Sequence, residues 1–136
     1  MARILIVDDE PALRESLVVA LHKAGHGVTS VGDGQAALEA AEKLPFEVVI
    51  TDLIMPNVDG LEAIKRFRKT SEHVRIIAMS GGGRTRQFDV LDYARQFGAD
   101  EAIAKPFRIA ELLGLVRKVL GEPALGEPVH GDPGKD

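Results

Sequence analysis

Short apolar runs alternate with amphipathic segments along most of the chain. Four of these runs are continuous and rich in β-branched residues, a pattern typical of strands that are buried on both faces of a parallel sheet. A fifth run contains more polar residues, which favours a place at the edge of the sheet. The predicted strands cover Ile4–Val7, His26–Val31, Val48–Thr51, Ile76–Ser80 and Ala102–Ala104.

Between these runs, apolar residues recur at steps of three and four, which is the spacing of an amphipathic helix. Gly25, Gly98 and Gly121 follow three of these segments, at the position where glycine commonly ends a helix. Asp33 is a suitable N-cap for the second helix. The predicted helices are marked by the apolar residues within Leu13–Ala24, Ala37–Ala41, Leu61–Arg68, Val90–Phe97 and Ile109–Leu120.

Strand and helix alternate five times, which predicts an α/β fold with helices on both faces of a parallel sheet. The common solution for five strands is a flavodoxin-like, three-layer (βα)5 arrangement with strand order 2-1-3-4-5. Ligands of such folds bind beyond the carboxyl ends of the strands, near the point where the strand order reverses. We therefore expect the functional site close to the ends of the first and third strands.

The composition changes at Glu122, after which an acidic residue followed by proline recurs at positions 122, 127 and 132. Proline interrupts a helix, and the apolar residues are too few to offset the entropy cost of ordering. We expect one globular domain over residues 1–121 and a disordered tail or linker over residues 122–136. The alternative for this segment is a short peptide-recognition motif.

Charge and composition exclude several classes of protein. A net charge of -4 argues against a dedicated nucleic-acid surface, which normally requires a basic excess. The absence of cysteine excludes disulfides and thiolate nucleophiles. Every apolar run is shorter than the roughly 20 residues that span a bilayer, and the N-terminus lacks the features of a signal peptide. We expect a cytoplasmic protein that binds neither nucleic acid nor membrane directly.

Polar residues that can bind a metal ion or take part in a reaction stand at the ends of the predicted strands. Asp8 and Asp9 follow the first strand, Asp52 the third, Ser80 ends the fourth, and Lys105 follows the fifth. Three converging carboxylates repel one another unless a cation lies between them, and oxygen ligands favour Mg2+ or Mn2+. A carboxylate can attack phosphorus when a metal ion and an ammonium group neutralise the transferred group. The pattern therefore indicates a phosphoryl-acceptor site.

Four short motifs occur in order along the chain. They are Val7-Asp8-Asp9-Glu10, Asp52 with Met55-Pro56 and Asp59-Gly60, Met79-Ser80-Gly81, and Lys105-Pro106-Phe107. With these motifs the chain resembles the receiver domains of two-component response regulators, from Ala2 to about Gly121.

The resemblance implies a role for each of these residues. Asp52 would be the phosphorylated aspartate, Asp9 a direct ligand of Mg2+, and Asp8 the acid that holds a metal-bound water. The backbone carbonyl of Ile54 would be a further ligand. In the same way, Ser80 would move toward the phosphoryl group.

The resemblance also implies that Lys105 would pair with the phosphoryl group and precede Pro106 through a cis peptide bond. A histidine kinase or histidine phosphotransferase would supply the phosphoryl group. The domain would signal by a conformational change to a downstream protein of unknown identity and would catalyse only its own phosphorylation and dephosphorylation. The domain would be a stand-alone receiver or one excised from a longer chain, and a dimer through the fourth and fifth helices is possible.

The chain departs from the family pattern at three positions. Receivers commonly place Tyr or Phe where this chain has Ala102, so we expect the switch to act through the fourth helix and the glycine-rich loop before it. Ile54 and Gly82 occupy positions that border the path of the hydrolytic water in receivers. Because neither side chain can orient water, we hypothesise slow self-catalysed loss of phosphate.

Other interpretations are open. The chain could be a pseudo-receiver that binds partners without phosphorylation, or a hydrolase with Asp52 as a transient nucleophile, although Ile54 then stands where a general acid is needed. Ser80 could simply begin a flexible loop, and Asp8 with Asp9 could cap a helix. We expect the surface to hold all four histidines, at positions 22, 26, 73 and 130, and a solvated helix end formed by Arg66, Arg68 and Lys69.

Overall fold

The computed structural model describes residues 2–53, 60–71, 73–81, 94–96 and 98–122. The strands are β1 (Arg3–Val7), β2 (Gly27–Val31), β3 (Val48–Asp52), β4 (Arg75–Ser80) and β5 (Glu101–Ala104). The helices are α1 (Pro11–Lys23), α2 (Gly34–Lys43), α3 (Gly60–Thr70) and α5 (Ile109–Leu120). Of the predicted fourth helix, the described part is helical at residues 94–96, and the remainder lies outside the described residues.

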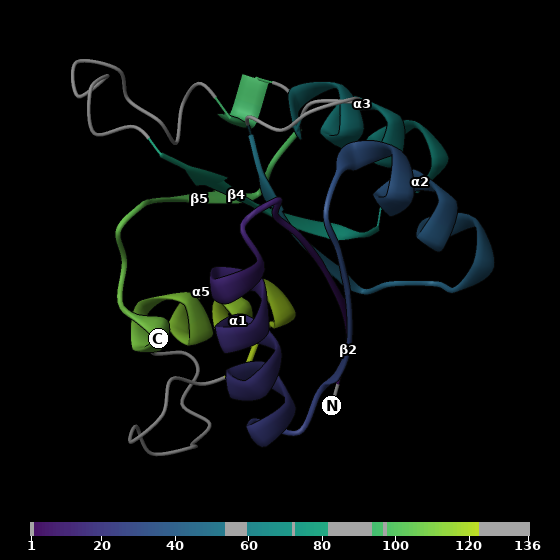
Figure 1. Ribbon diagram of the computed structural model, residues 1–136. Helices are drawn as coiled ribbons and strands as arrows, with labels where there is room; N and C mark the ends of the chain where they lie inside the picture. The colour runs from purple at the N-terminus through teal and green to yellow at the C-terminus, as the bar shows by residue number, and fades with distance from the viewer. Residues whose placement is uncertain (1, 54–59, 72, 82–93, 97, 123–136) are drawn as a thin grey trace, which may run out of the picture.

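All five strands are parallel and lie in the order β2-β1-β3-β4-β5, which confirms the predicted flavodoxin-like topology (Figure 1). Every residue of β3 is buried, whereas four of the five residues of β2 are only partly buried. The continuous apolar run and the mixed run therefore correspond to a central strand and an edge strand, as predicted. The carboxyl ends of β1 and β3 lie side by side at the reversal of strand order.

The sheet separates two apolar layers. Helices α1 and α5 cover one face, and α2 and α3 cover the other (Figure 1). Alternate residues of a strand point to opposite faces, so Ile4 and Ile6 of β1 pack in the layer with Leu17 of α1, while Leu5 packs in the layer with Phe67 of α3. Burial of each large aliphatic side chain contributes about 1.5–3 kcal/mol, so this layered core holds the strand ends in place.

Local signals in the sequence set the helix ends. The Asp33 carboxylate accepts a hydrogen bond from the Ala36 amide at 2.8 Å, which confirms the predicted N-cap of α2. Gly121 adopts φ of 78° at the end of α5, a left-handed conformation that favours glycine. Among the described residues, no helix combines the length and the apolar character that crossing a bilayer requires. Residues 123–136 lie outside the described residues, so the predicted tail stays a prediction.

Two expectations about the surface are wrong. His26 is buried, with 8% of its surface exposed, and its Nδ1 accepts a hydrogen bond from the Ala2 amide at 3.1 Å. It lies just before β2, where the pairing of β2 with β1 brings it beside the start of β1. His22 and His73 are exposed, as expected.

Arg68 is the second correction, because it is half-buried rather than part of a solvated helix end. Its guanidinium donates to the carbonyl oxygens of Val74 and Gly98, at 2.7 Å each, and forms an ion pair with Asp100 at 3.1 Å. The same Asp100 oxygen accepts the Ile76 amide at 2.8 Å. Arg68 thus joins α3 to the start of β4 and to the turn before β5.

Candidate functional site

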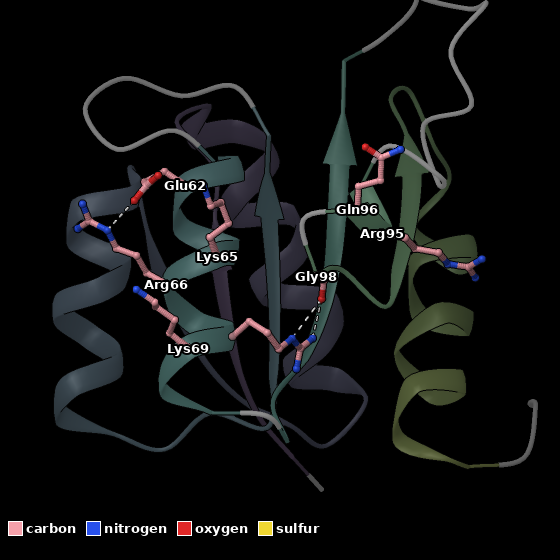
Figure 2. A pocket seen from close by; sticks show the side chains of 8 residues that line it. Glu62, Lys65, Arg66, Lys69, Arg95, Gln96 and Gly98 are labelled. Carbon is pink, nitrogen blue, oxygen red and sulfur yellow. Dashed lines mark hydrogen bonds and ion pairs between the residues drawn. The ribbon is translucent and has the colours of Figure 1, made fainter.

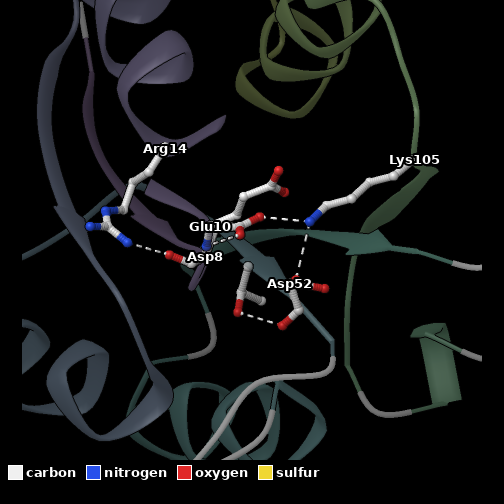
Figure 3. Close-up of polar contacts among 6 residues, drawn as sticks. Asp8, Glu10, Arg14, Asp52 and Lys105 are labelled. Atoms are coloured by element: carbon white, nitrogen blue, oxygen red, sulfur yellow. Dashed lines mark hydrogen bonds and ion pairs between the residues drawn. The ribbon is translucent and has the colours of Figure 1, made fainter. Parts of the chain in front are cut away.

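The predicted polar residues meet at the carboxyl ends of the strands. Asp8 follows β1, Asp52 is the last residue of β3, and Lys105 follows β5 (Figure 3). Oxygen atoms of Asp8, Asp9 and Asp52 lie within 4.8 Å of one another. Ser80 ends β4 at the same edge, and its carbonyl oxygen accepts the backbone amide of Lys105. Parallel strands explain this convergence, because their carboxyl ends lie at a common edge.

Asp8 is fully buried, and its backbone and its Oδ1 make three hydrogen bonds. Its backbone amide donates to the Val31 carbonyl at 3.1 Å, and its Oδ1 accepts the Glu10 amide at 2.8 Å. Its own carbonyl oxygen accepts Nη1 of Arg14 at 2.6 Å (Figure 3). Asp9, by contrast, is exposed. The turn after β1 therefore presents one fixed buried carboxylate and one that faces solvent.

The Lys105 ammonium lies between two buried carboxylates. Its Nζ is 2.8 Å from Oδ2 of Asp8 and 3.1 Å from Oδ2 of Asp52 (Figure 3). Burial alone lowers the pKa of Lys105, but the hydrogen bond to Asp8 and the charge of Asp52 outweigh it and raise the pKa above its usual value. Lys105 is therefore positively charged at neutral pH. The peptide bond from Lys105 to Pro106 is cis, as the family resemblance implies.

The charge balance of this site favours a bound cation. Against the three carboxylates of Asp8, Asp9 and Asp52, Lys105 supplies a single positive charge. Like charges at this separation repel strongly in a partly buried setting. The donor set consists of oxygen atoms, which fits a hard divalent cation such as Mg2+ or Mn2+. Ile54, the predicted source of a backbone ligand, lies outside the described residues.

The family profile described as the response regulator receiver domain matches residues 4–117. The chain belongs to this family. Receiver domains are generally non-catalytic signalling domains that bind Mg2+ at an acidic site and interact with kinases or phosphotransferases. The site at the carboxyl ends of β1 and β3 is in the place where the fold predicts a ligand.

Individual relatives show both the extent of the similarity and its limits. The chain is 32% identical to the response regulator receiver protein CpdR of Brucella abortus, covering 88% of this chain and 98% of CpdR. It is 35% identical to the transcriptional regulatory protein TrcR of Mycobacterium tuberculosis over 87% of this chain, but it spans only 45% of TrcR.

Two solved structures are similar in fold, and one of them contains Mg2+ and BeF. The response regulator TrrA of Thermotoga maritima, solved in complex with Mg2+ and BeF, has a TM-score of 0.74 and 34% identity, with 88% of this chain and 99% of that chain covered. A receiver domain of a Francisella response regulator has a TM-score of 0.80 and 25% identity, with 89% and 98% covered. Both similarities extend over the whole of the receiver fold.

Arg14 is the residue of this region that sequence reasoning missed. It lies on α1, one turn after the acidic pair, and its side chain reaches back over the turn to the Asp8 carbonyl. An arginine one turn beyond an acidic strand end, on a helix that packs against the same strand, is the signal that could have identified it. Long side chains on a helix point toward its N-terminus, which makes this contact possible.

Proposed function

We propose that this protein is a phosphorylation-operated switch in which Asp52 accepts a phosphoryl group from a histidine kinase or histidine phosphotransferase. The observation that carries the proposal is the contact of one ammonium group, that of Lys105, with both Asp8 and Asp52 at distances of 2.8 and 3.1 Å. This arrangement places positive charge beside a carboxylate that can act as a nucleophile. Membership of the receiver family supports the same assignment.

The proposed reaction is an in-line transfer. A carboxylate oxygen of Asp52 forms a bond to phosphorus while the bond from phosphorus to the donor imidazole nitrogen breaks. The imidazole carries a proton on its other ring nitrogen, so it keeps the electron pair and leaves as a neutral group. The charge of Lys105 offsets the negative charge of the transferred group and orients it. Asp9, Asp52 and the carbonyl of Ile54 would hold Mg2+, with Asp8 as the acid behind a metal-bound water. When bound, the ion supplies further neutralisation of charge.

The switch itself would begin at Ser80. Its hydroxyl would hydrogen-bond the phosphoryl group, and its backbone is already joined to Lys105 through the Ser80 carbonyl. Ala102 of β5 pairs with Ala78 of β4, so a small side chain occupies the position where an aromatic ring is common in receivers. The readout would therefore pass through the loop after β4 and the fourth helix, much of which lies outside the described residues.

The proposal extends to the partner on which the switch acts, by its class only. The switch would act on a protein partner in the cytoplasm, without direct binding to nucleic acid, and phosphorylation could favour a dimer through the fourth helix and α5. Because the chain spans 45% of TrcR, the activity of that whole protein is not transferred to this chain. The chemistry would be limited to gain and loss of its own phosphoryl group.

The direct test is labelling with acetyl phosphate. We expect intact-mass measurement to show one added phosphoryl group in the presence of Mg2+ and none with a chelator. Asp52→Asn should abolish the addition. Asp33→Asn is the matched control, because Asn caps a helix as well as Asp and Asp33 is not one of the three acids that cluster at the site. Equal labelling of the Asp52→Asn variant would overturn the proposal.

A pseudo-receiver is the alternative function. It would show no Mg2+-dependent labelling, and beryllofluoride would leave its NMR spectrum unchanged. The buried ion pairs of Lys105 with Asp8 and Asp52 favour a receiver that is phosphorylated, because a module that only binds partners has no need of these pairs.

A further inference from the structure

A groove lined by positive side chains lies beside α3. It has a volume of about 630 Å3, and the described residues that line it include five basic side chains and one acidic one, although the chain as a whole has a net charge of -4. We call it the basic groove and define it by Lys65, Arg68 and Lys69 of α3 and by Gly98 across from that helix. Arg95 also lines it, but its guanidinium points away from α3 (Figure 2).

The basic groove has a fixed floor and an adaptable rim. The Arg68 guanidinium is committed to Gly98 and Asp100, so it forms a rigid part of the floor. Lys65 and Lys69 are exposed, line the groove and stand one helical turn apart. Several separate carboxylates on an extended segment match such a rim better than one compact anion does.

The end of α5 belongs to the other face of the sheet from α3, but one residue connects the two regions. Gly121, just after α5, lines a hollow of about 420 Å3 together with Asp100 and Arg75. Asp100 is the residue whose Oδ2 lies 3.1 Å from Nη2 of Arg68, and Arg68 lines the basic groove. The chain that continues from Gly121 therefore starts at the hollow that Asp100 lines, and Asp100 is the ion-pair partner of Arg68.

The segment that continues from Gly121 has the complementary charge. Residues 122–136 contain four acidic residues and one lysine, and three of the acids precede proline at five-residue intervals. Proline favours an extended chain of about 3.1 Å per residue, so the segment can reach roughly 45 Å. A domain of this size has a radius of gyration of about 14 Å. Length, starting point and charge all permit contact within one molecule.

We propose that the acidic C-terminal segment, residues 122–136, docks in the basic groove of its own chain. Attachment to α5 gives the segment a high effective concentration, so weak exposed ion pairs suffice for partial occupancy. The docked segment covers the face formed by α3 and the turn before β5. Because the contact depends on exposed charges, it weakens as salt is added.

A spin label tests this contact in the full chain. The protein has no cysteine, so Gly131→Cys gives a single attachment site for a nitroxide in the segment. We expect the label to broaden the amide NMR signals of Lys65, Lys69 and Gly98 at about 10 mM salt, where the Debye length is roughly 30 Å. At about 1 M salt, with a Debye length of roughly 3 Å, at least half of the broadening should be lost.

Charge reversal gives the matched comparison. Lys65→Glu with Lys69→Glu should remove most of the broadening at low salt. Lys23→Glu with Lys43→Glu makes the same charge change at the exposed ends of α1 and α2, and it should leave the broadening in place.

Other results would overturn the proposal. Broadening that spreads over all faces of the domain, or that survives reversal in the groove, contradicts docking at this site. The segment in the groove could come from the same chain or from a second copy. Mixing spin-labelled protein with isotope-labelled protein that carries no spin label distinguishes the two sources. Broadening of the isotope-labelled chains in that mixture would assign the groove to a second copy and overturn the intramolecular contact.

Discussion

Arg14 donates from Nη1 to the carbonyl oxygen of Asp8 at 2.6 Å, so a side chain of α1 fixes the turn that carries the acidic pair. A hydrogen bond from a charged donor is worth about 1.5–3 kcal/mol when its partner is buried, as Asp8 is. We expect Arg14→Met to lower the free energy of unfolding by about 1–2 kcal/mol and to weaken Mg2+ binding. Urea unfolding with and without Mg2+ measures both effects.

The control for this variant is Glu15→Gln on the exposed face of α1, which should change neither quantity. If Arg14→Met destabilises the fold yet leaves Mg2+ affinity unchanged, Arg14 holds the helix only and has no influence on the acidic turn.

Lys105 stabilises two buried carboxylates, and its removal takes away the positive charge that contacts both of them. Breaking a buried ion pair by removal of one partner costs about 3–5 kcal/mol, and less at a partly open site. We expect Lys105→Met to lower the free energy of unfolding by about 2 kcal/mol without Mg2+. Added Mg2+ should stabilise the variant more than the wild type, because the ion meets a more negative site.

Arg66→Met provides the comparison for Lys105. Arg66 pairs with Glu62 at 2.9 Å, and the two side chains are 52% and 44% exposed, so the change should cost less than about 1 kcal/mol and show no dependence on Mg2+. Equal losses in the two variants would mean that burial at the acidic site does not strengthen the Lys105 contacts.

Arg68 and Arg66 lie two residues apart on α3 and should differ sharply on replacement by lysine. Arg68 donates to two carbonyl oxygens and Asp100, contacts that a lysine ammonium cannot reproduce together. We expect Arg68→Lys to lower the free energy of unfolding by about 1.5–3 kcal/mol. Arg66→Lys alters an exposed pair with Glu62 and should change it by less than about 0.5 kcal/mol. Similar values in chemical denaturation would contradict a joining role for Arg68.

His26 should make the fold sensitive to mild acid. Burial is the largest cause that lowers its pKa below 6.5, and Arg117 adds to the shift, whereas Glu122 and Glu47 oppose it. The Nδ1 atom also accepts the Ala2 amide, which requires that nitrogen to be unprotonated. As pH falls below 6.5, the unfolded chain binds the proton first. The stability contribution is therefore complete above pH 6.5 and is lost as pH falls through the folded pKa.

The measurement is the free energy of unfolding between about pH 7.5 and pH 5, near the ordinary range of histidine. We expect the wild type to lose stability across this range more steeply than His26→Gln, and His22→Gln, which alters an exposed residue, to follow the wild type. Parallel curves for the wild type and His26→Gln would show that other groups cause the pH dependence.

The sequence predicted the parts of this structure that follow from local pattern. The run from Val48 to Thr51 is apolar at every position but the last and rich in β-branched residues, which is typical of a strand covered on both faces. Asp52 is then expected at the carboxyl end of this central strand, beside the acids that follow the neighbouring strand. These inferences need only periodicity and the topology of parallel sheets.

Contacts that depend on the meeting of distant segments could not be predicted in this way. His26 is buried because its ring meets the Ala2 amide across 24 positions of sequence, and Arg68 meets the Gly98 carbonyl across 30. Neither partner offers a side-chain signal, because both are backbone groups. Polar residues that bond to remote backbone look like ordinary surface residues in a sequence.

The last prediction concerns the lifetime of the phosphorylated state. Ile54 and Gly82, which lie outside the described residues, flank the acceptor and the switch residue in sequence, and neither side chain can hydrogen-bond the water that hydrolyses an acyl phosphate. We expect Ile54→Asn with Gly82→Glu to shorten the lifetime by about tenfold, below the 10²- to 10⁴-fold typical of a positioned acid-base group, because orientation of water is the smaller contribution. A phosphorylated pulse followed by intact mass measures the decay. Val19→Asn with Gly114→Glu places the same kinds of side chain at exposed positions of α1 and α5 and should leave the lifetime unchanged. Equal lifetimes in all three proteins would show that the water is positioned by other groups.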